Sequence, residues 1–203
     1  MSSKQKGNTY ERKTAKVLGD WWGYEFYRTP SSGGLHGWSS DLNVAGDIVT
    51  SPESEFPFVV ECKNRESGGW TLESIVLDKH DIKNWWEQCV QDARRVNKTP
   101  VLVFTRNRAE DFVMMPYVET VYNLLEANDK PAMRTYVEYT DDLTKQKERF
   151  DVLITSVTGF TSFTPDFWKE NSMKDWDTVT RLTKDIEAPV EDIDDIVGKL
   201  KNN

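Results

Sequence analysis

The stretch Phe58-Val59-Val60-Glu61-Cys62-Lys63-Asn64 joins an apolar run to two opposite charges. In a β-strand, residues i and i+2 point to the same face of the sheet. Glu61 and Lys63 are therefore expected side by side at the end of a buried strand, with Cys62 turned into the core behind them. Opposite charges in such a place are costly unless they have partners or a chemical role. The simpler interpretation is a cross-strand ion pair at a strand end. The neighbouring segments are needed to distinguish this ion pair from a chemical role.

The composition describes a folded chain of 203 residues, most simply one domain with appendages. Aromatic residues make up 12%, which argues against disorder. No apolar run approaches the roughly 20 residues that span a bilayer, and the first residues do not form a secretory signal. The two cysteines lack metal-ligand spacing, and only two histidines accompany them, which argues against structural zinc. These features predict a protein of a reducing cytoplasm without a membrane partner.

The net charge of −8 at first argues against a nucleic-acid partner. The charge is unevenly spread, however. Residues 1–108 hold 15 Lys or Arg and 14 Asp or Glu, whereas the remainder holds 11 and 20. A nearly neutral N-terminal half can still carry a local basic groove, so the net charge of the whole chain does not exclude a nucleic-acid partner.

Hydrophobic periodicity and turn residues predict an α/β fold with a central mixed sheet flanked by helices. A first helix is expected over 8–22, with Asn8 or Thr9 as its cap and Glu11 in its first turn. Residues 112–115 are expected to form an edge strand closed by Pro116. The other expected helices cover 81–97, 117–127 and, at the acidic C-terminus, 186–203. The other expected strands cover 24–28, 42–50, 56–62, 100–104, 134–139 and 150–156.

Three carboxylates are expected to converge at one end of this sheet. Asp47 leads into a short apolar strand, and antiparallel pairing with the next strand brings it close to Glu61, while Glu11 comes from the first helix. Converging carboxylates repel one another unless a cation lies between them, and oxygen-only ligands suit Mg²⁺ or Mn²⁺. Such a cation is what phosphodiester hydrolysis needs, and Lys63 beside it can orient or deprotonate a water.

At these residues the chain resembles a known group of nucleases. Gly46-Asp47 followed by Glu61-Cys62-Lys63 is similar to the signature of the PD-(D/E)XK, or restriction-endonuclease-like, superfamily. Within it, the Holliday junction resolvases of archaea and phages are the most similar group. Over residues 4–115, the further likenesses are the opening Lys6-Gly7-Asn8-Thr9-Tyr10-Glu11-Arg12, Arg28 with the loop Ser31-Ser32-Gly33-Gly34, and Gln88 to Ala93 leading to Pro100-Val101-Leu102-Val103.

The resemblance implies a restriction-endonuclease-like core and a role for each matching residue. The implied metal ligands for Mg²⁺ or Mn²⁺ are Glu11, Asp47, Glu61 and the carbonyl of Cys62. Lys63 becomes the catalytic lysine, and Gln88 orients active-site groups or DNA. The implied DNA-binding residues are Lys6, Arg28, Ser31, Ser32, Arg65 and Arg94. The partner is branched or double-stranded DNA, and a homodimer is expected because a four-way junction is two-fold symmetric.

Several alternatives remain open at this stage. Gly46 stands where the superfamily has Pro, and Asp41 rivals Asp47 as the motif aspartate. Glu11 could simply match the helix dipole, and Gln88 and the Arg94-Arg95 pair could be structural or solvated. The function expected first is a metal-dependent endonuclease that resolves junctions. The rivals are a restriction or repair nuclease on linear DNA and a DNA-binding module without activity. Residues 1–115 are expected to form the nuclease core and residues 116–203 an extension packed on it.

Overall fold

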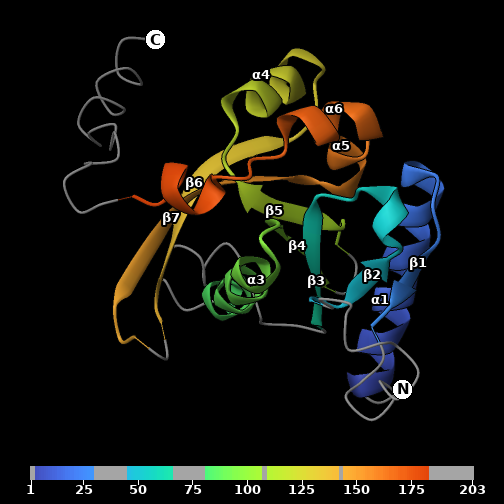
Figure 1. Ribbon diagram of the computed structural model, residues 1–203, viewed down its shortest axis with the longest axis horizontal. Helices are drawn as coiled ribbons and strands as arrows, with labels where there is room; N and C mark the ends of the chain where they lie inside the picture. Colours follow the sequence, from blue (N-terminus) through green and yellow to red (C-terminus); the bar gives the residue numbers. More distant parts are fainter. Residues whose placement is uncertain (1–2, 30–44, 66–80, 107–108, 142–143, 183–203) are drawn as a thin grey trace, which may run out of the picture.

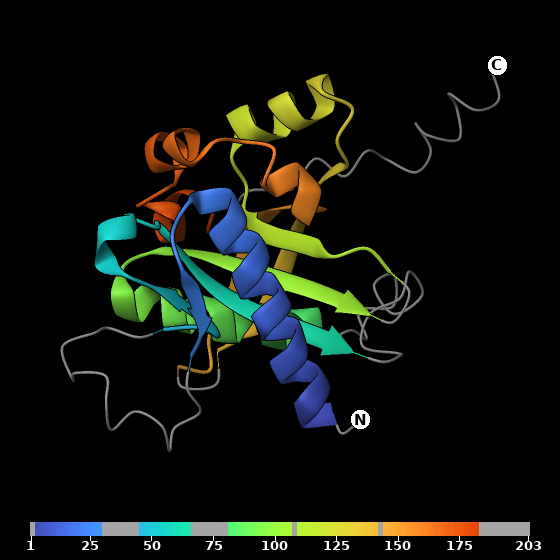
Figure 2. The same ribbon diagram turned by 90° about the vertical axis from the view of Figure 1, so that its right-hand side faces the viewer.

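A seven-stranded mixed sheet organises the protein. The structure is a computed structural model and describes residues 3–29, 45–65, 81–106, 109–141 and 144–182. The strand order is β1-β2-β3-β4-β5-β7-β6, and helices lie on both faces (Figures 1 and 2). The predicted α/β class with a central mixed sheet is thereby confirmed. The strands are β1 (Phe26–Arg28), β2 (Ile48–Thr50), β3 (Phe58–Arg65), β4 (Thr99–Arg106), β5 (Phe112–Pro116), β6 (Ala132–Thr140) and β7 (Lys147–Ser156).

The helices vary widely in length. The longer ones are α1 (Ser3–Trp22), α3 (Ile82–Val96) and α4 (Glu119–Ala127). The short ones are the 3₁₀ turn η2 (Pro52–Ser54), α5 (Val157–Phe160), α6 (Pro165–Asn171) and α7 (Trp176–Val179). None of the helices in the described part of the chain is long and apolar enough to span a membrane.

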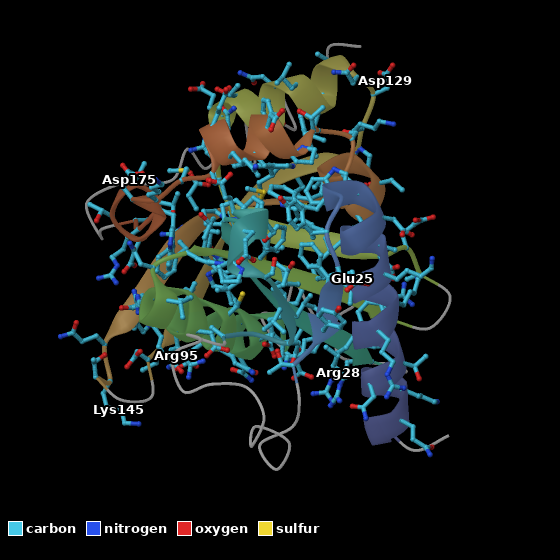
Figure 3. All side chains as sticks on the ribbon, turned by 45° about the vertical axis from the view of Figure 1, so that its right-hand side comes forward. Glu25, Arg28, Arg95, Asp129, Lys145 and Asp175 are labelled. Atoms are coloured by element: carbon cyan, nitrogen blue, oxygen red, sulfur yellow. The ribbon has the colours of Figure 1, made fainter. Side chains whose placement is uncertain are left out.

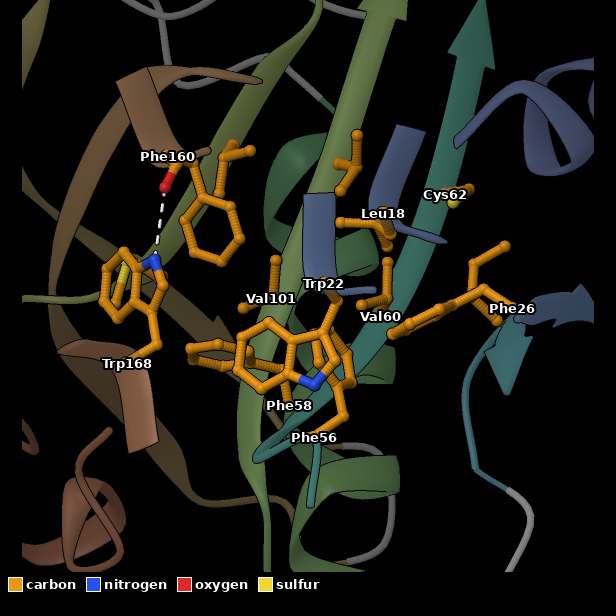
Figure 4. Packing of buried hydrophobic residues seen from close by; sticks show 14 of the residues in the cluster. Leu18, Trp22, Phe26, Phe56, Phe58, Val60, Cys62, Val101, Phe160 and Trp168 are labelled. Atoms are coloured by element: carbon orange, nitrogen blue, oxygen red, sulfur yellow. Dashed lines mark hydrogen bonds between the residues drawn. The ribbon is translucent and has the colours of Figure 1, made fainter. Parts of the chain in front are cut away.

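Strand β3 lies in the middle of the sheet and is buried on both faces. It runs parallel to β4, whereas its pairing with β2 is antiparallel. Phe58, Val60 and Cys62 pack into the aromatic cluster on the α1 face, which Figure 4 shows with Trp22 and Phe56. Val59 packs on the other face against α3. Because side chains alternate along a strand, Glu61 and Lys63 also lie on the α3 face.

Several predicted bounds and one predicted position in the sheet were wrong. Residues 45–47, which were expected to belong to a strand over 42–50, precede β2 and are not in a strand. Helix α1 begins at Ser3 rather than near residue 8, and the Thr9 hydroxyl donates to the Gln5 carbonyl inside the helix instead of capping it. Glu11 therefore lies in the middle of the helix, where a dipole-matching role in the first turn no longer applies. Strand β5 is internal rather than an edge, because β7 pairs with it on the side away from β4, up to Pro116 opposite Val152.

The chain beyond residue 116 contributes to both layers of the core. Val121 of α4, Phe160 of α5 and Trp168 of α6 pack in the cluster that α1 covers. Phe150 of β7 and Trp176 of α7 pack in the cluster that α3 covers. The division into a core at 1–115 and an extension at 116–203 stays a prediction, and the terminal helix expected over 186–203 lies outside the described residues.

Candidate active site

Glu61 and Lys63 form a close ion pair on the α3 face of β3. The ammonium Nζ of Lys63 lies 2.5 Å from Oε1 of Glu61 and 2.9 Å from Oε1 of Gln88 on α3. The Glu61 side chain is 2% exposed, whereas that of Lys63 is 23% exposed. The strand alternation places the two side chains together as predicted, but β3 continues to Arg65, so the pair lies within the strand rather than at its end. Helix α3 adds Gln88. The result is a charge pair that is anchored on the buried side and still open to solvent at the ammonium.

Asp47 lies at the entry to β2, next to the backbone of β3. Its main-chain N–H donates to the Val60 carbonyl at 2.8 Å, and its carboxylate Oδ2 accepts from the Cys62 N–H at 2.9 Å. The predicted antiparallel pairing of the two strands is confirmed, with Ile48 opposite Val60. The pairing brings the Asp47 carboxylate to the residue that follows Glu61.

The local backbone explains why Gly46, and not proline, precedes this aspartate. Gly46 has φ +76°, and a Cβ atom there would lie 2.6 Å from the Val60 carbonyl oxygen. Its N–H donates to Oδ2 of Asp92 on α3 at 3.2 Å. Proline holds φ near −65° and has no N–H. It could therefore neither adopt this positive φ nor donate the hydrogen bond to Asp92. The departure from the superfamily pattern is therefore a local solution for placing Asp47.

The electrostatic environment of Glu61 is that of a buried acid among other acids. The pKa of Glu61 is raised to about 7, first by burial and then by the nearby charges of Asp47 and Asp92, while Lys63 opposes these effects. Burial disfavours the charged form because the carboxylate loses its hydration. A hard divalent cation would relieve the repulsion between Asp47 and Glu61. The oxygen donors of Asp47, Glu61 and the Cys62 carbonyl fit such an ion, since Mg²⁺ is commonly held by one or two carboxylates and several waters.

Glu11 is held by a different partner. Nε of Arg28 donates a hydrogen bond to Oε2 of Glu11, and both side chains are largely buried. Arg28 lies on β1 opposite Ile48, and Ile48 is the residue that follows Asp47. Within the described ranges, no three or more Asp, Glu, Cys or His side chains form a group that could hold a metal ion. The expected convergence of three carboxylates is thus not present as a cluster among these residues, and Glu11 is paired with Arg28.

The other predicted residues that the structure describes come from three different elements, α1, β3 and α3. Arg65 ends β3, with its guanidinium 5.6 Å from the centre of the Trp85 ring and its Nε 3.9 Å from Asp81. Lys6 lies in the N-terminal part of α1. Ser31, Ser32 and Asp41 lie outside the described residues.

Arg94 lies in a network of charged groups that joins α3 to β7 and α7. Its Nε and Nη2 donate to the two carboxylate oxygens of Asp177 at 2.9 and 2.8 Å. Its Nη2 also lies 3.0 Å from Glu148. Bidentate contacts of this kind are among the stronger hydrogen bonds of proteins. The contacts hold Arg94 in a structural position, and its predicted contact with DNA stays untested.

Asp92 is a residue of the site that the sequence analysis missed. It lies four residues after Gln88 on α3, so both side chains lie on the same face of that helix. Gln88 contacts Lys63, and Asp92 contacts Gly46. The helical spacing from Gln88 was the signal that could have identified it.

Comparisons with known proteins identify the family of the chain. A sequence profile of the family described as "Phage putative PDDEXK endonuclease" matches residues 2–170. The chain is also 27% identical over 112 residues to protein D14 of Escherichia phage T5, a match that covers 54% of this chain and 68% of that protein. No solved structure matches the chain. Since the profile covers most of the sequence, the chain belongs to the family of phage PD-(D/E)XK endonucleases.

Proposed function

We propose that the protein is a metal-dependent DNA endonuclease that hydrolyses phosphodiester bonds in branched DNA, with the four-way junction as the first candidate substrate. The observation that carries the endonuclease chemistry is the connected array of Asp47, Glu61, Lys63 and Gln88 beside the second half of β3. The choice of a branched substrate rests on the resemblance to junction resolvases and on no contact in the structure.

The residues that would hold the metal ion are Asp47, Glu61 and the carbonyl of Cys62. Bound there, Mg²⁺ or Mn²⁺ supplies Lewis acidity toward the phosphate and lowers the pKa of a water. Asp47 is fixed for this task by its bond to the Cys62 N–H, and Glu61 by burial and by Lys63. Glu11 joins this set when Arg28 releases it.

Lys63 is proposed to orient the attacking water or the scissile phosphate. A lysine ammonium has three N–H donors, and Glu61 and Gln88 each accept one of them. The third donor can then face a phosphate oxygen or a water. Gln88 fixes the direction of the ammonium, because its amide oxygen holds Nζ from the α3 side.

The proposal also includes contacts with the phosphate backbone of DNA. Positively charged and hydroxyl side chains make most such contacts, and the residues assigned to them are Lys6, Arg28, Ser31, Ser32 and Arg65. Release of Arg28 from Glu11 would let its guanidinium contact a phosphate at the same step. Because a four-way junction is two-fold symmetric, the proposed assembly is a homodimer with one active site in each subunit.

The test is cleavage of a matched DNA panel made of a four-way junction, a flap, a linear duplex and a single strand. Each substrate is incubated with Mg²⁺, with Mn²⁺ and with EDTA. Glu61→Gln is the site variant. Asp129→Asn is the control, since Asp129 lies on the side of the molecule away from Arg28 (Figure 3) and its φ of +53° is one that asparagine tolerates.

Symmetric nicking of the junction that is lost with EDTA and in Glu61→Gln, but not in Asp129→Asn, would support the proposal. Equal cutting of linear duplex would keep the chemistry and move the function to a restriction or repair nuclease. Binding without cutting, and without saturable stabilisation by Mg²⁺ in a thermal melt, would point to an inactive DNA-binding module.

A further inference from the structure

We propose that Asp92 is a positioning residue of this site, which holds the backbone of Gly46 so that Asp47 faces the metal position. The inference rests on the proposed function. Asp92 comes from α3, whereas Gly46 immediately precedes Asp47 in the segment leading into β2. Their contact joins α3 to residues 45–47, which belong to neither a helix nor a strand.

The Gly46-Asp47 step is held from several directions. The Thr29 hydroxyl donates to the Gly46 carbonyl at 2.8 Å, and the Thr29 N–H donates to the Asp47 carbonyl at 2.8 Å. On the other side, the Asp47 N–H donates to Val60 at 2.8 Å. These bonds fix the carbonyl groups of Gly46 and Asp47 and the N–H of Asp47. The Gly46 N–H is satisfied by Asp92, at 3.2 Å.

The carboxylate of Asp92 is itself held in place. Its Oδ1 lies 3.0 Å from Nη2 of Arg95, one turn further along α3, while Oδ2 accepts from the Gly46 N–H. The Asp92 side chain is 24% exposed. One oxygen therefore fixes the orientation of the carboxylate, and the other makes a charge-assisted hydrogen bond to the backbone. Helix α3 thus supports both halves of the site, through Gln88 on Lys63 and through Asp92 on Gly46.

This bond matters because Gly46 adopts a left-handed conformation, and its N–H is the backbone group of the Gly46-Asp47 step that Thr29 and Val60 do not hold. With φ at +76°, the residue has other accessible conformations, as glycine is permissive. Losing Asp92 leaves the Gly46 N–H without this acceptor and lets the Asp47 carboxylate move. Groups that orient a ligand without touching the metal typically change metal affinity or activity by about 10–100-fold.

The experiment measures two quantities on the full-length protein. The first is hydrogen exchange of the Gly46 amide by NMR in EDTA, which does not depend on metal or activity. The second is the Kd for Mn²⁺ by titration calorimetry. The variants are Asp92→Ala, which loses the acceptor, and Asp92→Asn, which keeps an oxygen that can accept the bond. Glu87→Ala on the same helix is the control, since it removes a carboxylate paired with Gln91 rather than with the site.

Asp92→Ala is expected to speed exchange of the Gly46 amide and to weaken Mn²⁺ binding by about 10-fold or more. Asp92→Asn is expected to lie much closer to the wild type in both measurements, and Glu87→Ala to match the wild type. Unchanged exchange and affinity in Asp92→Ala would overturn the inference. Equal losses in Asp92→Asn and Asp92→Ala would also overturn it, because charge rather than the hydrogen bond would then be responsible.

The two proposals fail in different ways. If the wild-type protein binds Mn²⁺ but cuts no DNA, the proposed function fails while Asp92 is still judged by exchange and affinity. If the wild type cuts DNA and Asp92→Ala behaves like it, only the inference fails. If the wild type neither binds Mn²⁺ nor cuts DNA, both are overturned.

Discussion

Arg28 on β1 donates a hydrogen bond to Glu11 in the middle of α1, and the two side chains form an ion pair. The two side chains were predicted to serve different ligands, a metal ion for Glu11 and DNA for Arg28. The structure pairs them instead, with the Arg28 side chain 21% and the Glu11 side chain 15% exposed. The pair also joins the first helix to the edge strand next to Asp47.

The first prediction is that Glu11 and Arg28 are energetically coupled. In a double-mutant cycle of Glu11→Ala and Arg28→Ala, measured by urea unfolding in EDTA, the expected coupling free energy is about 1–3 kcal/mol, since the two charges are largely desolvated. The control is the Lys16–Asp20 pair on the same helix, which is 76% and 72% exposed. Its expected coupling is about 0.3–0.5 kcal/mol. Equal coupling in the two cycles would contradict the prediction.

The second prediction concerns two glycines with nearly the same φ. Gly46→Ala and Gly23→Ala each place alanine in the left-handed region, at a cost of about 1–2 kcal/mol. The new methyl group at residue 23 meets nothing within 4 Å, whereas at residue 46 it meets the Val60 carbonyl and the Val59 side chain. Gly46→Ala should therefore lower the free energy of unfolding by at least about 1 kcal/mol more than Gly23→Ala. Urea unfolding measures both, and equal losses would show that the segment shifts freely.

The sequence was sufficient for the parts of the site that depend on local periodicity. Period-two alternation placed Glu61 and Lys63 on one face and Cys62 on the other. The short apolar strand after Asp47 indicated the pairing with β3. These features depend on neighbours within one strand or one hairpin, where the sequence pattern directly expresses the geometry.

The parts that the sequence could not supply depend on contacts between distant segments. Strand β5 became internal because β7, about forty residues later, pairs with it. The contact between Asp92 and Gly46 spans 46 residues. The spacing of four residues from Gln88 places Asp92 on the same face of α3, but it does not reveal the contact with the distant Gly46. The start of α1 was placed too late because Gly7 and Asn8 resemble a helix boundary, although the helix continues through them.

The third prediction compares two fully buried tryptophans. Nε1 of Trp168 donates to the Phe160 carbonyl at 3.1 Å, as the dashed line in Figure 4 shows. Nε1 of Trp86 has no hydrogen-bond partner among the described residues. Tryptophan to phenylalanine removes the same atoms at each place, so the difference isolates the N–H group. Trp168→Phe should therefore be more destabilising than Trp86→Phe by about 1–3 kcal/mol in urea unfolding, because an unpaired buried donor is itself costly. The reverse order would contradict this account.

The fourth prediction concerns Asp177, whose carboxylate is bound by Arg94 and lies next to Arg181. Burial disfavours its charged form, but Arg94 and Arg181 outweigh burial and hold the pKa of Asp177 below its usual value. A carboxyl with a lowered pKa in the folded state adds stability above its unfolded pKa, about 3.9, and that stability disappears as pH falls through the folded pKa. Asp177→Asn should therefore be clearly less stable than the wild type at pH 7, and the gap should narrow as the pH falls toward 3. Thermal unfolding across this range measures the difference in stability between the two proteins.

The control is Asp175→Asn, at an exposed position two residues earlier. A stability difference for Asp177→Asn that is constant with pH would contradict the lowered pKa of Asp177.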